Sequence, residues 1–169
     1  MEFLLRPWQL ADAPALARYA NNAAIADNLR DIFPHPYTLA DAQSYIRMCM
    51  DADQTRQLCY AIEMKGEAAG SIGVFWGQDV YRRTAELGYW LAEPYWGRGV
   101  MRAAIREICA QAFDRFDLVR IEARPFAHNT GSRKALAYAG FVLEGVLHRS
   151  AFKNGRVLDT CMYALYQQI

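Results

Sequence analysis

The chain places a strand, two glycines and its longest helix in direct succession. Thr84–Leu91 is predicted as a strand, and Val100–Phe116 as a helix, because apolar residues in the second segment recur at steps of three and four. Gly97 and Gly99 stand between the two, where the absence of side chains lets the backbone approach a ligand closely. The first helical turn leaves N–H groups unpaired, and the helix dipole favours an anion there. Together these features predict a phosphate-binding turn between a sheet and a helix.

Two common nucleotide-binding motifs do not account for this turn. A P-loop ends in Gly-Lys-Ser/Thr, because the lysine and the hydroxyl serve the phosphates and the magnesium ion. Here Gly99 is followed by Val100 and Met101. A dinucleotide-binding fingerprint has a third glycine, and Arg102 stands in its place. The sequence therefore excludes both kinds of nucleotide site.

The other segments predict strands and helices on either side of this turn. Further strands are expected at Glu2–Arg6, Cys59–Met64, Ser71–Trp76, Val119–Ala123, Phe141–Phe152 and Val157–Tyr166. Further helices are expected at Asp12–Ala20, from Thr38 to near Ala52 and at Gly131–Ala139, with a short helix and an irregular loop over Asn21–Tyr37. Asn154-Gly155 predicts a hairpin between the last two strands. This order favours an α/β sandwich of a mixed sheet and helices.

Length and charge narrow the class of protein further. At roughly 150 residues per domain, the 169 residues predict a single domain over residues 1–169. Nineteen basic and eighteen acidic residues give a net charge of +1, which argues against a nucleic-acid binder. No apolar run reaches the ~20 residues that a membrane span needs, and no signal peptide is recognised, so we expect a cytoplasmic protein.

The four cysteines and three histidines predict no metal site. Cys49, Cys59, Cys109 and Cys161 lie far apart in the sequence, in apolar surroundings and without a CxxC pair. We therefore expect buried free thiols in a reducing compartment. The histidines are equally scattered.

The segment Tyr95–Met101 resembles the pyrophosphate loop of the GNAT acetyltransferases, whose pattern is Gln/Arg-x-x-Gly-x-Gly/Ala. Trp96 falls on its first position, Gly99 on its glycine and Met101 on its last position. The two departures are similar to the RimJ/RimL-like branch, in which tryptophan replaces the polar residue. Asn129–Phe141 also resembles the Asn-x-x-Ser…Gly-Phe segment of that branch. With the opening Leu5-Arg6-Pro7, the resemblance covers essentially the whole chain.

The resemblance implies the GNAT fold, with a central mixed, mostly antiparallel sheet flanked by helices, and acetyl-CoA as co-substrate. Leu91 and Ala92 would offer backbone groups to the pantetheine arm, and Asn129 would hydrogen-bond the same arm. The backbone N–H groups of the loop would bind the pyrophosphate. The cofactor-binding residues expected in this loop are Trp96, Gly97, Arg98, Gly99, Val100 and Met101.

The resemblance also suggests the catalytic groups. Ser132 would protonate the departing CoA thiolate, unless it is merely part of the first turn of a helix. Glu86 is the leading candidate for the base, with Glu122 and Glu144 as weaker alternatives; otherwise Glu86 is an exposed carboxylate at a strand edge.

Two further sets of side chains lie on or next to helices predicted from the sequence. A row of arginines at four-residue steps, Arg98, Arg102 and Arg106, would touch CoA phosphates or form a solvated face. Tyr138 is expected to pack.

The activity implied is N-acetyl transfer to a primary amine, with the N-terminal α-amine of a protein or peptide as the favoured acceptor. A small-molecule amine (a polyamine, amino acid or antibiotic) is the alternative acceptor. A further alternative is a module that binds acyl-CoA without turnover. Neither a nucleic acid nor a membrane is expected as partner, and the resemblance makes a homodimer plausible.

Overall fold

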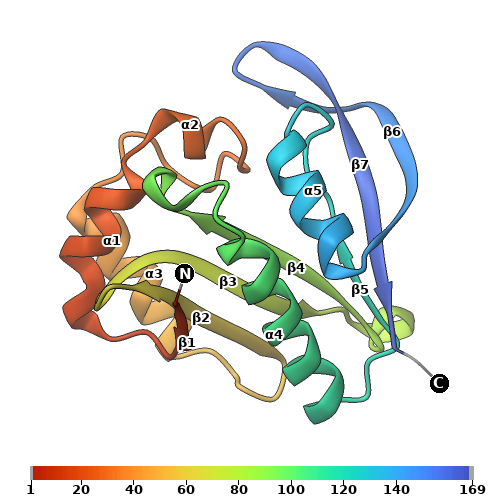
Figure 1. Cartoon of the computed structure of the whole chain (residues 1–169), viewed down its shortest axis with the longest axis horizontal. Coiled ribbons are helices and arrows are strands. Elements are labelled where there is room, and N and C mark those ends of the chain that lie inside the picture. Colours follow the sequence, from red (N-terminus) through yellow and green to blue (C-terminus); the bar gives the residue numbers. More distant parts are fainter. Residues whose placement is uncertain (1, 168–169) are drawn as a thin grey trace. The chain divides into compact units, whose positions relative to one another are not determined.

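The structure, a computed structural model, describes residues 2–167 and contains the expected mixture of strands and helices (Figure 1). Its strands are β1 (Leu4–Arg6), β2 (Gln57–Met64), β3 (Glu67–Trp76), β4 (Thr84–Leu91), β5 (Arg120–Ala123), β6 (Val142–Lys153) and β7 (Arg156–Tyr166). Its α-helices are α1 (Ala13–Ala20), α2 (Ala23–Ala26), α3 (Leu39–Met50), α4 (Val100–Arg115) and α5 (Thr130–Ala139). Within residues 2–167, seven strands form one sheet in the order β1-β2-β3-β4-β5-β7-β6. The mixed, mostly antiparallel sheet with flanking helices is thus confirmed.

The chain forms two compact units, and β3 and β4 contribute residues to both. The first unit runs to Gly73 and includes Tyr89–Val100, and the second comprises Val74–Gly88 and the residues from Met101 onward. The single domain expected over residues 1–169 stays a prediction. None of the helices in the described part of the chain is long and apolar enough to span a membrane.

In the first unit, α1, α2 and α3 bury their apolar faces against β2, β3 and the end of β4. Thr38 begins α3 as predicted, because its hydroxyl accepts a hydrogen bond from the Asp41 N–H while the Asp41 carboxylate accepts one from the Thr38 N–H. The resulting core contains Trp8, Ala13, Leu16, Ala20, Ile25, Tyr37, Ala42, Ile46, Cys49, Cys59, Ala61, Ala68 and Trp90. Burial of this surface holds the helices on the sheet.

In the second unit, α4 leads from β4 to its parallel neighbour β5. The register pairs Thr84 with Arg120 and Glu86 with Glu122. β7 then pairs antiparallel with both β5 and β6. The predicted hairpin is confirmed, because Asn154 and Gly155, with φ of 50° and 73°, form its two-residue turn. Figure 1 shows α5 beside this long hairpin.

The largest difference from the sequence prediction is the start of β3, which begins at Glu67 instead of Ser71. The early residues are small and have low strand propensity. Gly70 lies so close to β4 that an added Cβ would stand 2.6 Å from the Trp90 carbonyl oxygen. Gly70 weakens the strand prediction, and its missing side chain is what lets β4 approach β3 at this point.

Asp12, at the start of α1, is held in a partly buried ion pair with Arg6. Two Arg6 nitrogens donate to its carboxylate at 2.7 and 2.8 Å, and the Gln9 N–H donates at 3.0 Å. Arg6 also contacts Glu63 on β2, at 2.5 Å. Burial raises the pKa of Asp12, but the hydrogen bonds from Arg6 and Gln9 outweigh it and hold the pKa below its usual value.

We predict that Asp12→Asn lowers the free energy of unfolding by about 2 kcal/mol at pH 7, because it removes charged hydrogen bonds. Since the pKa is lowered in the folded state, this stabilisation is present above the ordinary carboxyl pKa of about 3.9 and is lost as the pH falls through the folded value. Urea denaturation of both proteins at several pH values measures the difference, which should shrink below about pH 4. Glu107→Gln, at an exposed position of α4, is the control. An equal loss of stability at every pH would contradict the prediction.

Candidate active site

The loop between β4 and α4 has the backbone conformation that the sequence predicts for an anion-binding turn. Gly97 and Gly99 have φ of +70° and +78°, in the left-handed region that other residues rarely adopt. The 16-residue helix α4 begins directly after them at Val100, and its first turn contains no acidic residue that would occupy the positive end of the helix dipole. The loop is therefore shaped to present backbone N–H groups to an anion.

Trp96 closes this loop on itself. Its indole N–H donates a hydrogen bond of 2.6 Å to the carbonyl oxygen of Leu91, at the end of β4. The Ala92 N–H donates to Ala69 on β3, and the Ala92 carbonyl accepts from Tyr95. Because successive backbone groups of a strand point to opposite edges, the Leu91 N–H points away from β3. Leu91 and Ala92 were both expected to offer backbone groups to the ligand. The Leu91 N–H points away from β3, whereas the Ala92 N–H and carbonyl are used in hydrogen bonds within the chain.

A cavity of about 350 Å³ lies beside the start of the same loop, within the first unit. It is lined by Arg18, Tyr19, Asn21, Asn22, Glu93 and Pro94. Asn22 caps α2 through its side-chain oxygen and donates from its amide nitrogen to Glu93 at 2.7 Å. This bond fixes the α1–α2 connection to the loop that follows β4.

The two charged residues that line the cavity differ in whether they form an ion pair. Arg18 forms an ion pair of 2.7 Å with Glu67, which also accepts from the Tyr19 hydroxyl. Glu93 forms no ion pair with any residue between 2 and 167. Glu93 is therefore a carboxylate of the cavity lining whose negative charge is not balanced by an ion pair within residues 2–167. Sequence reasoning missed this site, because its members come from separate segments and follow no motif.

In the second unit, Asn129 and Ser132 contact each other at the start of α5. The Asn129 side-chain oxygen accepts a hydrogen bond of 3.1 Å from the Ser132 N–H, so Asn129 is the helix cap. The amide nitrogen of Asn129 donates to no group in residues 2–167. Both residues are half-buried. The cap accounts for the Asn-x-x-Ser spacing and leaves the Asn129 amide donor available.

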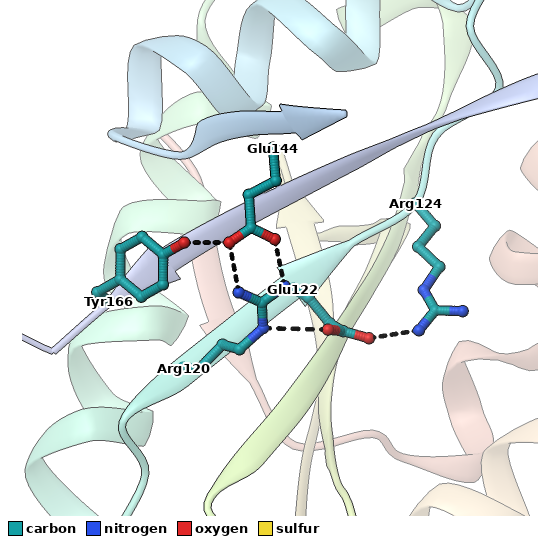
Figure 2. A network of polar contacts seen from close by, with 5 residues as sticks. All are labelled: Arg120, Glu122, Arg124, Glu144 and Tyr166. Atoms are coloured by element: carbon teal, nitrogen blue, oxygen red, sulfur yellow. Dashed lines mark hydrogen bonds and ion pairs between the residues drawn. The ribbon is translucent and has the colours of Figure 1, made fainter. Parts of the chain in front are cut away.

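The three candidate bases have different surroundings, which Figure 2 shows in part. Glu86 on β4 is paired in register with Glu122 on β5. Glu122 lies between two guanidinium groups, at 3.2 Å from Arg120 and 2.6 Å from Arg124. Glu122 therefore forms ion pairs with two guanidinium groups.

Glu144, the third candidate, is tied more firmly. Arg120 donates to both of its carboxylate oxygens, at 2.6 and 2.7 Å, and the Tyr166 hydroxyl donates as well (Figure 2). The hydrogen bonds from Arg120, and then from Tyr166, lower the pKa of Glu144 to about 2. A carboxylate of such low basicity is a poor proton acceptor near neutral pH. This environment argues against Glu144 as the base.

Two arginines of the row Arg98, Arg102 and Arg106 lie on α4 and contact α5. The Arg102 guanidinium lies 5.9 Å from the ring centre of Tyr138, and Arg106 donates to the Tyr138 carbonyl at 2.7 Å. Tyr138 is 61% exposed, which differs from the expectation that it packs. Its ring lies beside the Arg102 guanidinium instead. Arg98, in the loop, is exposed. The arginine row is therefore divided between a contact of two helices and the loop.

The predicted site residues form separate groups. Residues 91 to 100 form one closed loop in the first unit, which Met101 continues into α4; Asn129 contacts Ser132, and Glu86 pairs with Glu122, in the second unit. All four cysteines are free and buried, as expected. Within residues 2–167, no group of three or more His, Cys, Asp or Glu side chains is arranged to hold a metal ion.

The sequence of this chain is similar to those of known proteins. The family described as "Acetyltransferase (GNAT) domain" matches residues 2–142. An uncharacterised N-acetyltransferase, p20 of Bacillus licheniformis, is 29% identical over 168 residues, which cover 97% of this chain and 92% of that protein. The ribosomal-protein-serine acetyltransferase of Escherichia coli K12 is 32% identical over 82 residues, covering 48% of this chain and 46% of that protein.

Among solved structures, RimJ of Mycobacterium smegmatis in complex with CoA-disulfide superposes with a TM-score of 0.84 at 28% identity. The match covers 97% of this chain and 81% of that one.

Proposed function

The chain belongs to the GNAT acetyltransferase domain family, and from this premise we propose that it acetylates the N-terminal α-amine of a protein or peptide. The protein is an acetyl-CoA-dependent N-acetyltransferase; the acceptor is the part that we infer. The loop of left-handed glycines before α4 supports the use of acetyl-CoA. The choice of acceptor is supported by a relative named a ribosomal-protein-serine acetyltransferase.

The residues of the chain fit the donor in chemical terms. The N–H groups from Arg98 to Met101 are suited to the pyrophosphate, since they combine unpaired donors with the positive end of α4. The Leu91 N–H and the Asn129 amide nitrogen are suited to the amide carbonyls of pantetheine. The assignment for Asn129 rests on the family resemblance and on its own unused donor.

The acceptor must lose a proton before it attacks the thioester carbon. An α-amine with a pKa of about 7.8 is about 14% neutral at pH 7, whereas a lysine side chain with a pKa of about 10.4 is about 0.04% neutral. The difference corresponds to roughly 3.5 kcal/mol. An α-amine therefore needs only a weak base, and this favours it in a site whose candidate bases are carboxylates.

We assign the base to Glu86 and the proton donor to Ser132. Glu86, on the cofactor strand β4 and in the region where the family resemblance places the base, would accept the ammonium proton, directly or through water. Ser132 would give its hydroxyl proton to the sulfur as the bond from sulfur to the acetyl carbon breaks.

The cavity beside Glu93 favours a second candidate, in which a small-molecule amine is the acceptor. A carboxylate without an ion-pair partner suits the ammonium group of a polyamine or amino acid. A module that binds acyl-CoA without turnover is the remaining alternative. A cytoplasmic location and a homodimer also remain our predictions, and light scattering at several protein concentrations tests the second.

The acceptor is tested by measuring the release of free CoA with a panel of peptides and small amines. We expect turnover with peptides that have a free N-terminus, and none with the same peptides blocked at the N-terminus but containing lysine. Turnover on small amines alone would overturn the protein acceptor and support the second candidate. Tight acetyl-CoA binding in calorimetry without turnover on any amine would instead support the binding module.

We predict that Gly99→Val raises the KM for acetyl-CoA at least tenfold, or about 1.4 kcal/mol, because a side chain there blocks the approach of the pyrophosphate. Gly66→Val is the matched control: Gly66 has φ of +83° and open space around it, so it reports the backbone strain without the ligand. Steady-state kinetics measure the KM, and circular dichroism checks the fold. An equal KM for the two variants would contradict the phosphate role of the loop.

We predict that Ser132→Ala lowers kcat at least tenfold with little change in the KM for acetyl-CoA, because a proton donor acts mainly in the transition state. Glu86→Gln should lower kcat more for a lysine-like acceptor than for an α-amine, since the first needs more help to deprotonate. Ser44→Ala, at an exposed position of α3, is the control. If Ser132→Ala keeps the parent kcat, the serine is only part of the helix start.

A further inference from the structure

Two cysteines from neighbouring elements of the first unit meet in its core. Cys49 is on the last turn of α3 and Cys59 is on β2. Their sulfur atoms are 2.9 Å apart, and the two residues are only 3% and 6% exposed. A disulfide bond is about 2.05 Å long, so its closure requires the sulfurs to approach by about 0.9 Å. The remaining cysteines, Cys109 and Cys161, belong to the second unit.

The surroundings of the pair are polar on the Cys59 side. The Tyr45 hydroxyl lies 3.5 Å from the Cys59 sulfur and 2.6 Å from the Ser71 hydroxyl. The edge of the Trp8 ring packs on Tyr45, with ring centres 5.7 Å apart. The Trp8 indole nitrogen is buried without a hydrogen-bond partner in residues 2–167. Cys59 is therefore in contact with the Tyr45 hydroxyl, which in turn contacts the Ser71 hydroxyl.

We propose that Cys49 and Cys59 form a reversible, peroxide-sensitive disulfide that links α3 to β2. The site is independent of acetyl transfer, and neither cysteine belongs to the loop or to the catalytic groups assigned above. In a reducing compartment the resting state is the dithiol, and peroxide converts it to the linked form.

The oxidation balances with hydrogen peroxide as the oxidant. The Cys59 thiolate attacks one peroxide oxygen, the O–O bond breaks, and the leaving hydroxide takes up a proton to give water and a Cys59 sulfenic acid. The Cys49 sulfur then attacks the Cys59 sulfur, and the S–O bond breaks as the hydroxide leaves with the Cys49 proton as a second water. Two thiols thus lose two electrons to one peroxide molecule, and a dithiol reductant reverses the change.

The division of roles follows from the hydrogen bond between the thiols. Cys59 accepts a hydrogen bond from Cys49 and lies near the Tyr45 hydroxyl, and these contacts lower the pKa of Cys59 to about 7. The pKa of Cys49 is raised, because Cys49 donates to Cys59 and is buried. A thiolate is the nucleophile in peroxide reduction, so Cys59 reacts first and Cys49 resolves the sulfenic acid.

The experiment treats the folded full-length protein with a small excess of hydrogen peroxide, alkylates the remaining thiols and digests with trypsin. Cleavage after Arg56 separates the two cysteines, so a disulfide joins the peptides 48–56 and 57–65. We expect this linked pair, a loss of two hydrogen masses from the intact protein, and reversal by dithiothreitol. The midpoint of thermal unfolding should rise by about 5 °C in the linked form, because the unfolded chain is constrained.

Matched variants decide the assignment. Cys109→Ser and Cys161→Ser should keep the linked peptides. Cys49→Ser, which keeps a hydroxyl donor beside Cys59, should abolish them and leave a Cys59 sulfenic acid that dimedone traps. Cys59→Ala should give neither product, and it preserves a second test if Cys49→Ser does not fold. Four unreacted thiols, over-oxidation of Cys59 without a link, or a link that involves Cys109 or Cys161 would each overturn the proposal.

Discussion

The turn from β4 into α4 is the constraint on which the candidate site depends. The chain must leave a buried strand end at Leu91 and enter a long helix at Val100, and two glycines in the left-handed region make this path accessible. The indole of Trp96 then fixes the beginning of the path by binding the Leu91 carbonyl. Because the helix starts directly after Gly99, the N–H groups of its first turn are free of internal partners. Fold and anion site are therefore built by the same few residues.

The tryptophan explains how this chain departs from the general pattern of its family. A polar residue at the first loop position would offer a side chain to the ligand. Trp96 instead donates its single N–H to the backbone of its own loop, and it is still 43% exposed. The binding groups that remain in the loop are those of the backbone and the exposed side chain of Arg98.

Periodicity and turn chemistry predicted most of the fold because they are local properties. The apolar repeat of α4, the Thr38 cap and the Asn154-Gly155 turn all lie at the expected positions. The first half of β3 was missed, since Ala68, Ala69 and Gly70 have low strand propensity and the closeness of β4 that requires Gly70 is not visible in the sequence. The loop glycines could be predicted in the same way as the turns. The Asn22–Glu93 bond, the Arg120 network and the Cys49–Cys59 contact could not, because each joins segments far apart in the sequence.

The Asn129 side chain has two hydrogen-bonding groups with separate roles. Its oxygen is committed to the first turn of α5, and its nitrogen is unused within the described chain. Aspartate or serine at this position would keep the oxygen that begins the helix while deleting the nitrogen. A substitution at this one position can therefore remove a ligand contact without lowering thermal stability. A homologue with aspartate or serine here would fold normally, yet it would lack the amide donor for a ligand carbonyl.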